Sequence, residues 1–99
     1  MEKEYYPVVV QAVAGEGRKV YAYFSDGSIR LYDMAPAIKR GGVFAPLADE
    51  GFFTQRLTVM NDTVAWDLSG RYDPEDCIDI DPFTLYAAPA VADPLESVG

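Results

Sequence analysis

Alternating hydrophobic and polar residues near the start of the chain predict β-strands. Residues 6–13 are rich in β-branched side chains, and residues 19–25 and 28–32 alternate in character. Asp26-Gly27 lies between the last two stretches. An Asp-Gly pair in this setting is typical of a two-residue type I′ turn, in which both central residues adopt positive φ. The pattern therefore predicts a hairpin of residues 19–25 and 28–32, with residues 6–13 as a further strand.

A two-residue loop would decide which side chains share each face of this hairpin, and a shift by one residue would exchange the faces. Tyr23 would pair with Arg30, and Phe24 with Ile29. One face then consists of core residues: Val20, Ala22, Phe24, Ile29 and Leu31. The other face is a candidate interaction surface, which consists of Tyr21, Tyr23, Arg30 and Tyr32. Tyr and Arg are frequent at interface hot spots, whereas cross-strand pairs of these residues also stabilise a sheet without any partner.

A second hairpin is predicted around Asn61-Asp62, between residues 56–60 and 63–67. Pairing Met60 with Thr63 brings four apolar side chains to one face, namely Leu57, Val59, Val64 and Trp66. The turn residues and the alternation agree on this register, which strengthens the prediction. Residues 77–80 are expected to add a short strand.

Short helices are expected at residues 34–40, 50–54 and 82–87. Asp33 and Asp81 precede the first and the last of them, where a carboxylate can accept hydrogen bonds from free N–H groups of the first turn. A proline follows each Asp within that turn, where it costs no intrahelical hydrogen bond.

Together these elements predict an α+β fold. Two hairpins and an edge strand would form a mostly antiparallel sheet, and the short helices would pack at its ends or on one face. The 99 residues suffice for a single small domain, which we place at residues 1–87. Residues 88–99 are rich in Ala, Pro and Asp and contain few large side chains, so a flexible C-terminal tail is expected there.

The composition excludes several kinds of site. The sequence contains no His and a single Cys, Cys77, so it cannot form a Ser-His-Asp triad, a Cys-His dyad or a His metal site. A formal net charge of −8 argues against direct binding to nucleic acid. No apolar stretch approaches the ~20 residues that span a bilayer, and one cysteine without an apolar leader favours the cytoplasm. We therefore expect a cytoplasmic protein with no catalytic site, no cofactor and no contact with a membrane.

The negative charge is concentrated in the second half of the chain. Residues 1–50 contain six basic and seven acidic residues, and residues 51–99 contain two and nine. A solvated acidic loop is one interpretation, and a docking patch for a basic partner is the other. Calcium would need about six to eight oxygen ligands from a tight loop, and no such motif is present, so no metal site is predicted. The candidate acidic docking patch consists of Asp73, Glu75, Asp76 and Asp79.

The order and spacing of several short segments carry a family resemblance. These segments are Asp26-Gly27, Arg30, Tyr32-Asp33, Pro36, the stretch from Gly42 to Leu47, Asp49, Phe52-Phe53, the stretch from Thr63 to Trp66 and that from Asp79 to Tyr86. In them the chain resembles the prokaryotic family known as domain of unknown function 2442, over roughly residues 6–87. The resemblance implies a compact α+β domain with a largely antiparallel sheet and no established activity.

The same resemblance bears on partners. Some members of that family look like an N-terminal module joined to a helix-turn-helix domain, and others resemble partners in toxin–antitoxin-like gene pairs. This chain has extra residues between Trp66 and Asp79, and nothing after Tyr86 could form a helix-turn-helix. Direct binding to DNA is therefore not expected.

These observations favour a non-catalytic protein-interaction module that binds a protein partner or forms a homodimer through the tyrosine-rich face. The alternative is a regulatory or antitoxin-like protein that neutralises a basic partner encoded nearby. A small enzyme that uses paired carboxylates is a third hypothesis, which is disfavoured because so short a chain has little material to wall a deep cleft.

Overall fold

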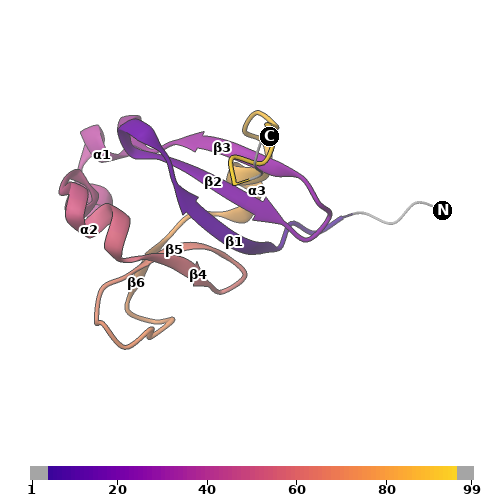
Figure 1. The fold of residues 1–99 in the computed structure, drawn as a ribbon. Helices are drawn as coiled ribbons and strands as arrows, with labels where there is room; N and C mark the ends of the chain where they lie inside the picture. Colours follow the sequence, from indigo (N-terminus) through magenta and orange to yellow (C-terminus); the bar gives the residue numbers. More distant parts are fainter. Residues whose placement is uncertain (1–4, 96–99) are drawn as a thin grey trace.

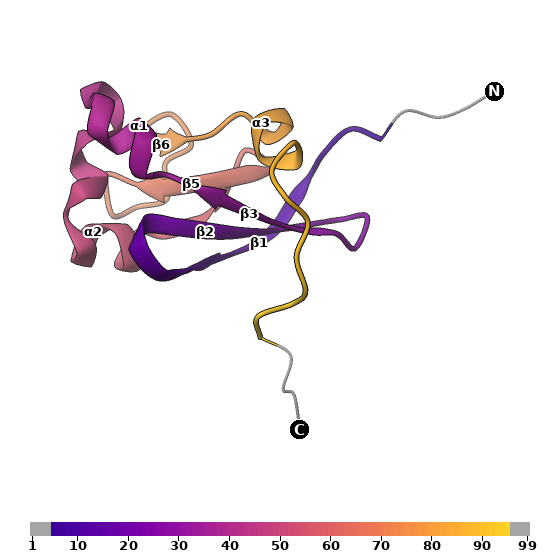
Figure 2. The ribbon, with the colours of Figure 1, turned by 90° about the horizontal axis from the view of Figure 1, so that it is seen from above.

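The two halves of the chain form two antiparallel sheets that share one core (Figure 1). The structure is a computed structural model and describes residues 5–95. Figure 2 shows the sheets as two layers, with α3 on the side of the second sheet. The core takes side chains from both layers, among them Phe24, Trp66 and Leu85. The predicted α+β fold is confirmed, although the strands form two sheets instead of one.

The first sheet consists of three strands in sequential order: β1 (Val9–Ala14), β2 (Lys19–Phe24) and β3 (Ile29–Asp33). Its inner face contributes Val9, Val20, Ala22 and Phe24 to the core, all of them buried. A β-bulge between Val9 and Gln11 leaves Val10 without a partner and exposed.

The turn between β2 and β3 differs from the predicted type I′ turn, because its loop has three residues instead of two. The Phe24 N–H donates to the Ser28 carbonyl (2.9 Å), and the Gly27 N–H donates to the Phe24 carbonyl (3.0 Å). In this loop only Gly27 has a positive φ (93°), which is the pattern of a type I turn followed by a left-handed glycine. A type I′ turn would also force Asp26 to positive φ, at a cost of about 1–2 kcal/mol. The Asp26 carboxylate instead accepts hydrogen bonds from the Ser28 N–H (2.9 Å) and hydroxyl (2.8 Å).

The longer loop shifts the predicted pairing by one residue and reverses the faces of β3. Tyr23 pairs with Ile29, and Ala22 pairs with Arg30. Because Ala22 points into the core, Arg30 points to the inner side of the sheet, and the same holds for Tyr32, the partner of Val20. The prediction that Tyr21, Tyr23, Arg30 and Tyr32 share one face is therefore wrong.

The second sheet contains β4 (Leu57–Met60), β5 (Thr63–Asp67) and β6 (Cys77–Asp79), in that order. The predicted pairing of Met60 with Thr63 is confirmed. Every residue of the central strand β5 is buried, and its polar groups find partners inside the protein. The Trp66 indole N–H donates to the Phe53 carbonyl (2.9 Å), and the Thr63 hydroxyl donates to the Ile80 carbonyl (2.6 Å).

The helices lie toward the ends of the two sheets (Figure 1). At one end are α1 (Ala35–Arg40), the 3₁₀ helix η2 (Gly42–Ala48) and α2 (Glu50–Gln55), and α3 (Pro82–Tyr86) lies toward the other. The predicted cap of α3 is confirmed, since Asp81 accepts from the Phe83 N–H (2.9 Å). At α1 the N-cap residue is Met34, which has no capping side chain, and Asp33 accepts from the Ala35 N–H (3.0 Å) from one residue earlier. Within residues 5–95, no helix is long and apolar enough to cross a membrane.

The segment after α3, predicted as a flexible tail, makes specific contacts over residues 88–93, which we call the C-terminal strap. The Leu31 N–H donates to the Pro89 carbonyl (3.0 Å), and the Val91 N–H donates to the Ile29 carbonyl (2.9 Å). The strap thus runs antiparallel along the outer edge of β3, and the boundary predicted at residue 87 excludes a segment that pairs with the sheet. Residues 1–4 of the predicted domain and residues 96–99 of the predicted tail lie outside the described residues.

We expect Gly27→Ala to lower the free energy of unfolding by about 1–2 kcal/mol, because an L-residue is strained at positive φ. A Cβ at this position meets nothing within 4 Å, so the cost comes from the backbone alone. Asn tolerates the left-handed region better than Ala, so Gly27→Asn should cost less. Urea denaturation of the three proteins tests this, and equal losses for both variants would contradict the assigned turn.

Candidate functional site

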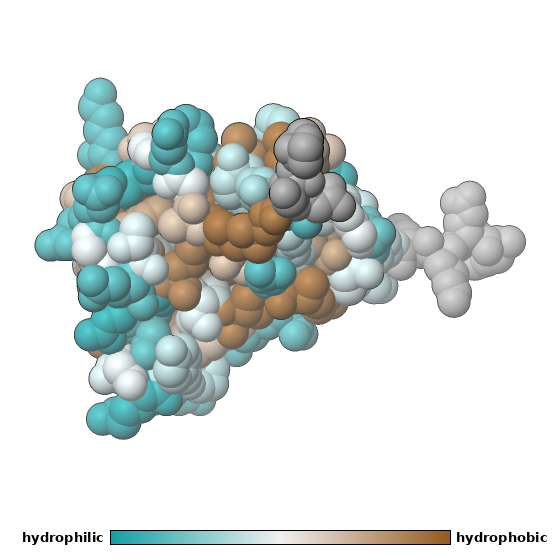
Figure 3. Space-filling model, in the orientation of Figure 1, coloured by the Kyte–Doolittle hydropathy of each residue, from teal (hydrophilic) through white to brown (hydrophobic). Residues whose placement is uncertain are grey.

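The outward side chains of the first sheet form an apolar surface, which we call the outer face. It combines the tyrosines of β2 with the aliphatic residues that the register places beside them on β3. Figure 3 shows hydrophobic patches on this side of the molecule. All of its members are partly exposed, and Val10 is 59% exposed. Its apolar and aromatic members are Val10 at the bulge, Val13, Tyr21, Tyr23, Ile29 and Leu31, and its polar members are Gln11, opposite Tyr23, and the pair Lys19 and Asp33 at one end.

One end of the outer face is hollowed. The hollow has a volume of about 670 Å³ and lies between η1 (Glu16–Arg18), β2 and the start of α2. Its floor includes the Tyr21 ring, which packs so closely on Gly15 that a Cβ there would lie 3.0 Å from the ring. Glu16, Glu50 and Lys19 also line it. This end therefore combines an aromatic floor with a predominantly acidic rim.

The strap covers the other end of the outer face. The Tyr23 hydroxyl donates a hydrogen bond to Asp93 Oδ1 (2.7 Å). Burial, together with this hydrogen bond and the negative charge of Asp93, raises the pKa of Tyr23 to about 12. Tyr23 is thus a neutral hydrogen-bond donor that ties the strap to the sheet.

Arg30, predicted to lie among the tyrosines, instead packs on the inner side against α3. Its guanidinium lies over the Tyr86 ring, 4.3 Å from the ring centroid, and its Nη1 donates to the Ala88 carbonyl (3.0 Å). The Tyr86 hydroxyl donates to Asp26 Oδ2 (2.6 Å). We call these three residues, Asp26, Arg30 and Tyr86, the Arg30 cluster. It connects the β2–β3 turn, α3 and the strap.

The Arg30 cluster perturbs the titration of two of its members. The hydrogen bond from Tyr86 lowers the pKa of Asp26, with further lowering by hydrogen bonds from Ser28 and by the charge of Arg30. The same hydrogen bond, with some burial, raises the pKa of Tyr86. Arg30 Nε is buried and has no hydrogen-bond partner among residues 5–95. No sequence pattern indicated this cluster, because Asp26 and Tyr86 are 60 residues apart.

The four acidic residues predicted as a docking patch lie on the loop before β6 and on β6 itself. Glu75, Asp76 and Asp79 are exposed, whereas Asp73 is half-buried and accepts a hydrogen bond from the Glu75 N–H (3.0 Å). Across the described chain, no group of three His, Cys, Asp or Glu side chains is arranged to hold a metal ion. Whether the exposed carboxylates bind a partner stays a prediction.

Cys77 and Asp67 lie at the two ends of this acidic loop. The thiol of Cys77 has a raised pKa, caused first by burial and then by Asp79 and other nearby carboxylates. Asp67 was not singled out, yet it is buried and accepts hydrogen bonds from the Tyr72 N–H (3.2 Å) and the Ser69 hydroxyl (3.3 Å). Asp67 therefore organises the start of the acidic loop.

A family model described as "Protein of unknown function (DUF2442)" matches residues 9–89. The match begins with β1 and ends on the strap. It therefore includes both sheets, the helices and all three residues of the Arg30 cluster. No curated protein and no solved structure matches the chain significantly.

We expect Tyr86→Phe to lower the denaturation midpoint near neutral pH. The variant loses the hydrogen bond that stabilises the Asp26 carboxylate, while its ring still packs on Arg30. Because the pKa of Asp26 is lower in the folded state than its ordinary value of 3.8, the ionised carboxylate stabilises the fold at any pH above 3.8. This stabilisation is lost as the pH falls from 3.8 through the pKa of Asp26 in the folded state. The difference in denaturation midpoint between the variant and the wild type should therefore become smaller below pH 3.8.

Denaturant titrations of both proteins at about pH 7 and about pH 3 measure this narrowing. Tyr72→Phe is the matched control, because Tyr72 is 65% exposed and should tolerate the same change without loss. A difference of equal size at both pH values would contradict the assigned role of the Tyr86–Asp26 bond.

Proposed function

We propose that this chain, which belongs to the DUF2442 family of proteins of unknown function, is a non-catalytic protein-interaction module whose outer face binds a partner protein. The partly exposed apolar surface on the first sheet is the observation that carries this proposal. Six apolar or aromatic side chains gather on it, beside a hollow of about 670 Å³. Contiguous apolar patches on a soluble protein often mark interaction sites.

The physical character of the outer face suits binding. Tyr21 and Tyr23 supply large contact areas with few rotatable bonds, and tyrosine is frequent at interface hot spots. Tyr21 is fixed by its close packing on Gly15. Side chains held in place on a rigid strand lose little conformational entropy when they bind.

Charge favours a basic partner over a second copy of this chain. The chain has a net charge of −8, and Glu16, Glu50 and Asp93 border the outer face, with Lys19 as the cation among them. Two copies would bring like charges together, which opposes association. The partner we propose therefore has an apolar centre surrounded by Lys or Arg, consistent with a regulatory or antitoxin-like role.

The acidic patch is a second candidate surface for the same class of partner. Glu75, Asp76 and Asp79 are exposed carboxylates close together on one loop and its following strand. A contact there would depend mainly on charge, whereas the outer face would add apolar burial. Photo-crosslinking from single positions can separate the two surfaces.

We expect a photoreactive benzoylphenylalanine at position 21, on the outer face, to crosslink a basic protein in the source cells. The same residue at position 72, on the acidic loop, is the matched control, because each variant replaces one Tyr by a similar ring. Mass spectrometry of the adducts identifies the partner and the site. The association rate of the purified pair should fall as salt rises.

The position that forms the adduct distinguishes the outer face from the acidic patch, and the identity of the crosslinked protein tests whether the partner is basic. A heterologous adduct from position 21 supports the outer face, and an adduct from position 72 alone would shift the proposal to the acidic patch. Adducts only between two copies of this chain, or none at either position, would refute a basic partner.

A further inference from the structure

The outer edge of β3 is paired with the strap over only part of its length. In an antiparallel ladder, alternate residues turn their N–H and C=O groups to opposite sides. Ile29 and Leu31 turn their backbone groups away from β2 and toward the strap. The Ile29 carbonyl accepts a hydrogen bond from the strap, and the Leu31 N–H donates one to it. Asp33 follows with the same orientation, because it is two residues further along β3.

Pro89 ends this pairing. A proline has no N–H to donate to the Leu31 carbonyl opposite it, and on its N-terminal side the chain leads away into α3. As a result, the Leu31 carbonyl and the Asp33 N–H make no backbone hydrogen bond to the strap or to another element within residues 5–95. Part of the edge therefore keeps an unused acceptor and an unused donor.

The strap itself is held by few contacts. Its two backbone hydrogen bonds to β3 are joined by the side-chain bonds from Arg30 to the Ala88 carbonyl and from Tyr23 to Asp93. Beyond Ala88, the side chains of Pro89, Ala90 and Ala92 are exposed, and those of Val91 and Asp93 are half-buried. A segment with so little buried apolar surface opens at lower free energy than the sheet it covers.

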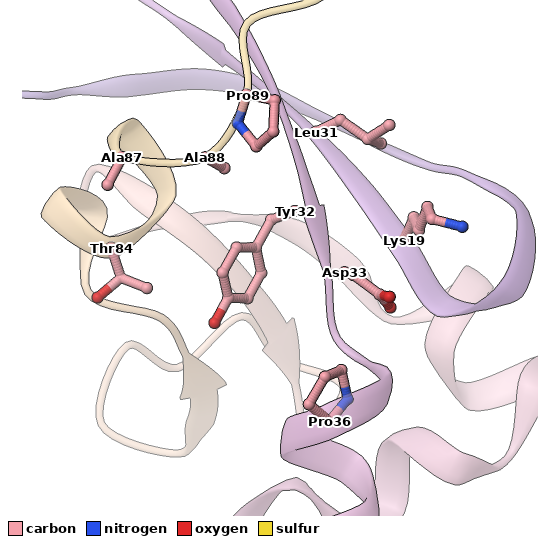
Figure 4. A pocket seen from close by; sticks show the side chains of 9 residues that line it. All are labelled: Lys19, Leu31, Tyr32, Asp33, Pro36, Thr84, Ala87, Ala88 and Pro89. Carbon is pink, nitrogen blue, oxygen red and sulfur yellow. The ribbon is translucent and has the colours of Figure 1, made fainter.

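A cleft adjoins the edge where the strap leaves it. Its volume is about 590 Å³, and its lining is mostly apolar. Figure 4 shows the Tyr32 ring, which extends from β3, beside Thr84 of α3, with Pro89 at the top of the view and Pro36 at the bottom. The strap contributes only Ala88 and Pro89 to the wall, so the cleft has room for a larger apolar side chain.

We propose that the outer edge of β3 is a docking site for an extended segment of a partner protein, which pairs antiparallel with Ile29 and Leu31 in place of the strap and inserts an apolar side chain into the adjoining cleft. Edge strands commonly accept an added strand in this way. The strap shows which kind of occupant fits, because it already lies there extended and antiparallel. This contact goes beyond the outer face, since it uses backbone groups at an edge.

A synthetic peptide provides the probe. It copies residues 88–95 with valine in place of Pro89, so that it offers the Leu31 carbonyl the N–H that the strap lacks. The unchanged strap sequence is the control peptide. We expect the valine peptide to bind the full chain more tightly than the control, with shifted NMR signals for the Ile29, Leu31 and Asp33 amides.

Two protein variants test whether the strap competes for this edge. Asp93→Ala removes the bond to Tyr23 and should tighten peptide binding several-fold. In a Cys77→Ser background, Ile29→Cys with Val91→Cys places two thiols at opposed positions, where a disulfide would fix the strap on β3. Oxidation of that variant should weaken peptide binding by at least about tenfold, and reduction of the same sample should restore it.

Equal peptide binding in the oxidised and reduced forms would overturn the proposal, as would the absence of binding to Asp93→Ala. Dimers that exchange straps between two copies, without peptide binding, would overturn the choice of a partner segment as occupant. None of these outcomes depends on the crosslinks from position 21, so the edge and the outer face can fail separately.

Discussion

The turn between β2 and β3 is the constraint on which most of the other contacts depend. Its three-residue loop, ending in left-handed Gly27, fixes the register of β3. Side chains in a strand alternate between faces, so this one choice sends Arg30 inward and Leu31 outward. An inward arginine needs partners, because a buried guanidinium without them is costly. The Tyr86 ring and the Ala88 carbonyl supply them, so the turn also decides where α3 and the strap lie.

The hairpin of β4 and β5 was predictable because turn chemistry and side-chain pattern both required one register, although its place in a separate sheet was not predicted. Asn61 and Asp62 adopt positive φ (56° and 62°), and only the pairing of Met60 with Thr63 brings the large apolar residues to one side. In the first hairpin the pattern could not decide. Both faces are rich in apolar or aromatic side chains, and Asp-Gly suits a two-residue loop as well as the end of a three-residue loop. Either register would therefore bury a face of apolar or aromatic side chains, so the pattern of hydrophobic residues did not exclude the wrong one.

The strap and the Arg30 cluster could not be predicted for a different reason. The strap pairs through backbone groups, which every sequence carries, and its Ala-Pro composition resembles that of a disordered tail. The Arg30 cluster joins residues far apart in the chain, and each has an ordinary local role. The outer face was predicted in part, since Tyr21 and Tyr23 belong to it. Its aliphatic members on β3, Ile29 and Leu31, were assigned to the core, because the predicted two-residue loop gave a register one residue away from the observed one.

The outer face and the edge of β3 meet at the strap, so the two contacts proposed above would be coupled through it. Tyr23 lies on the outer face and also holds Asp93, while Leu31 offers its side chain to that face and its N–H to the strap. A partner that takes the Tyr23 hydroxyl from Asp93 removes one of the few contacts that keep the strap in place. By thermodynamic reciprocity, a segment that displaces the strap then raises the affinity of the outer face by the same factor. Arg30 holds the Ala88 carbonyl at the point where the strap leaves α3, so the part of the strap that faces Ile29 and Leu31 begins one residue beyond a side-chain anchor on the sheet.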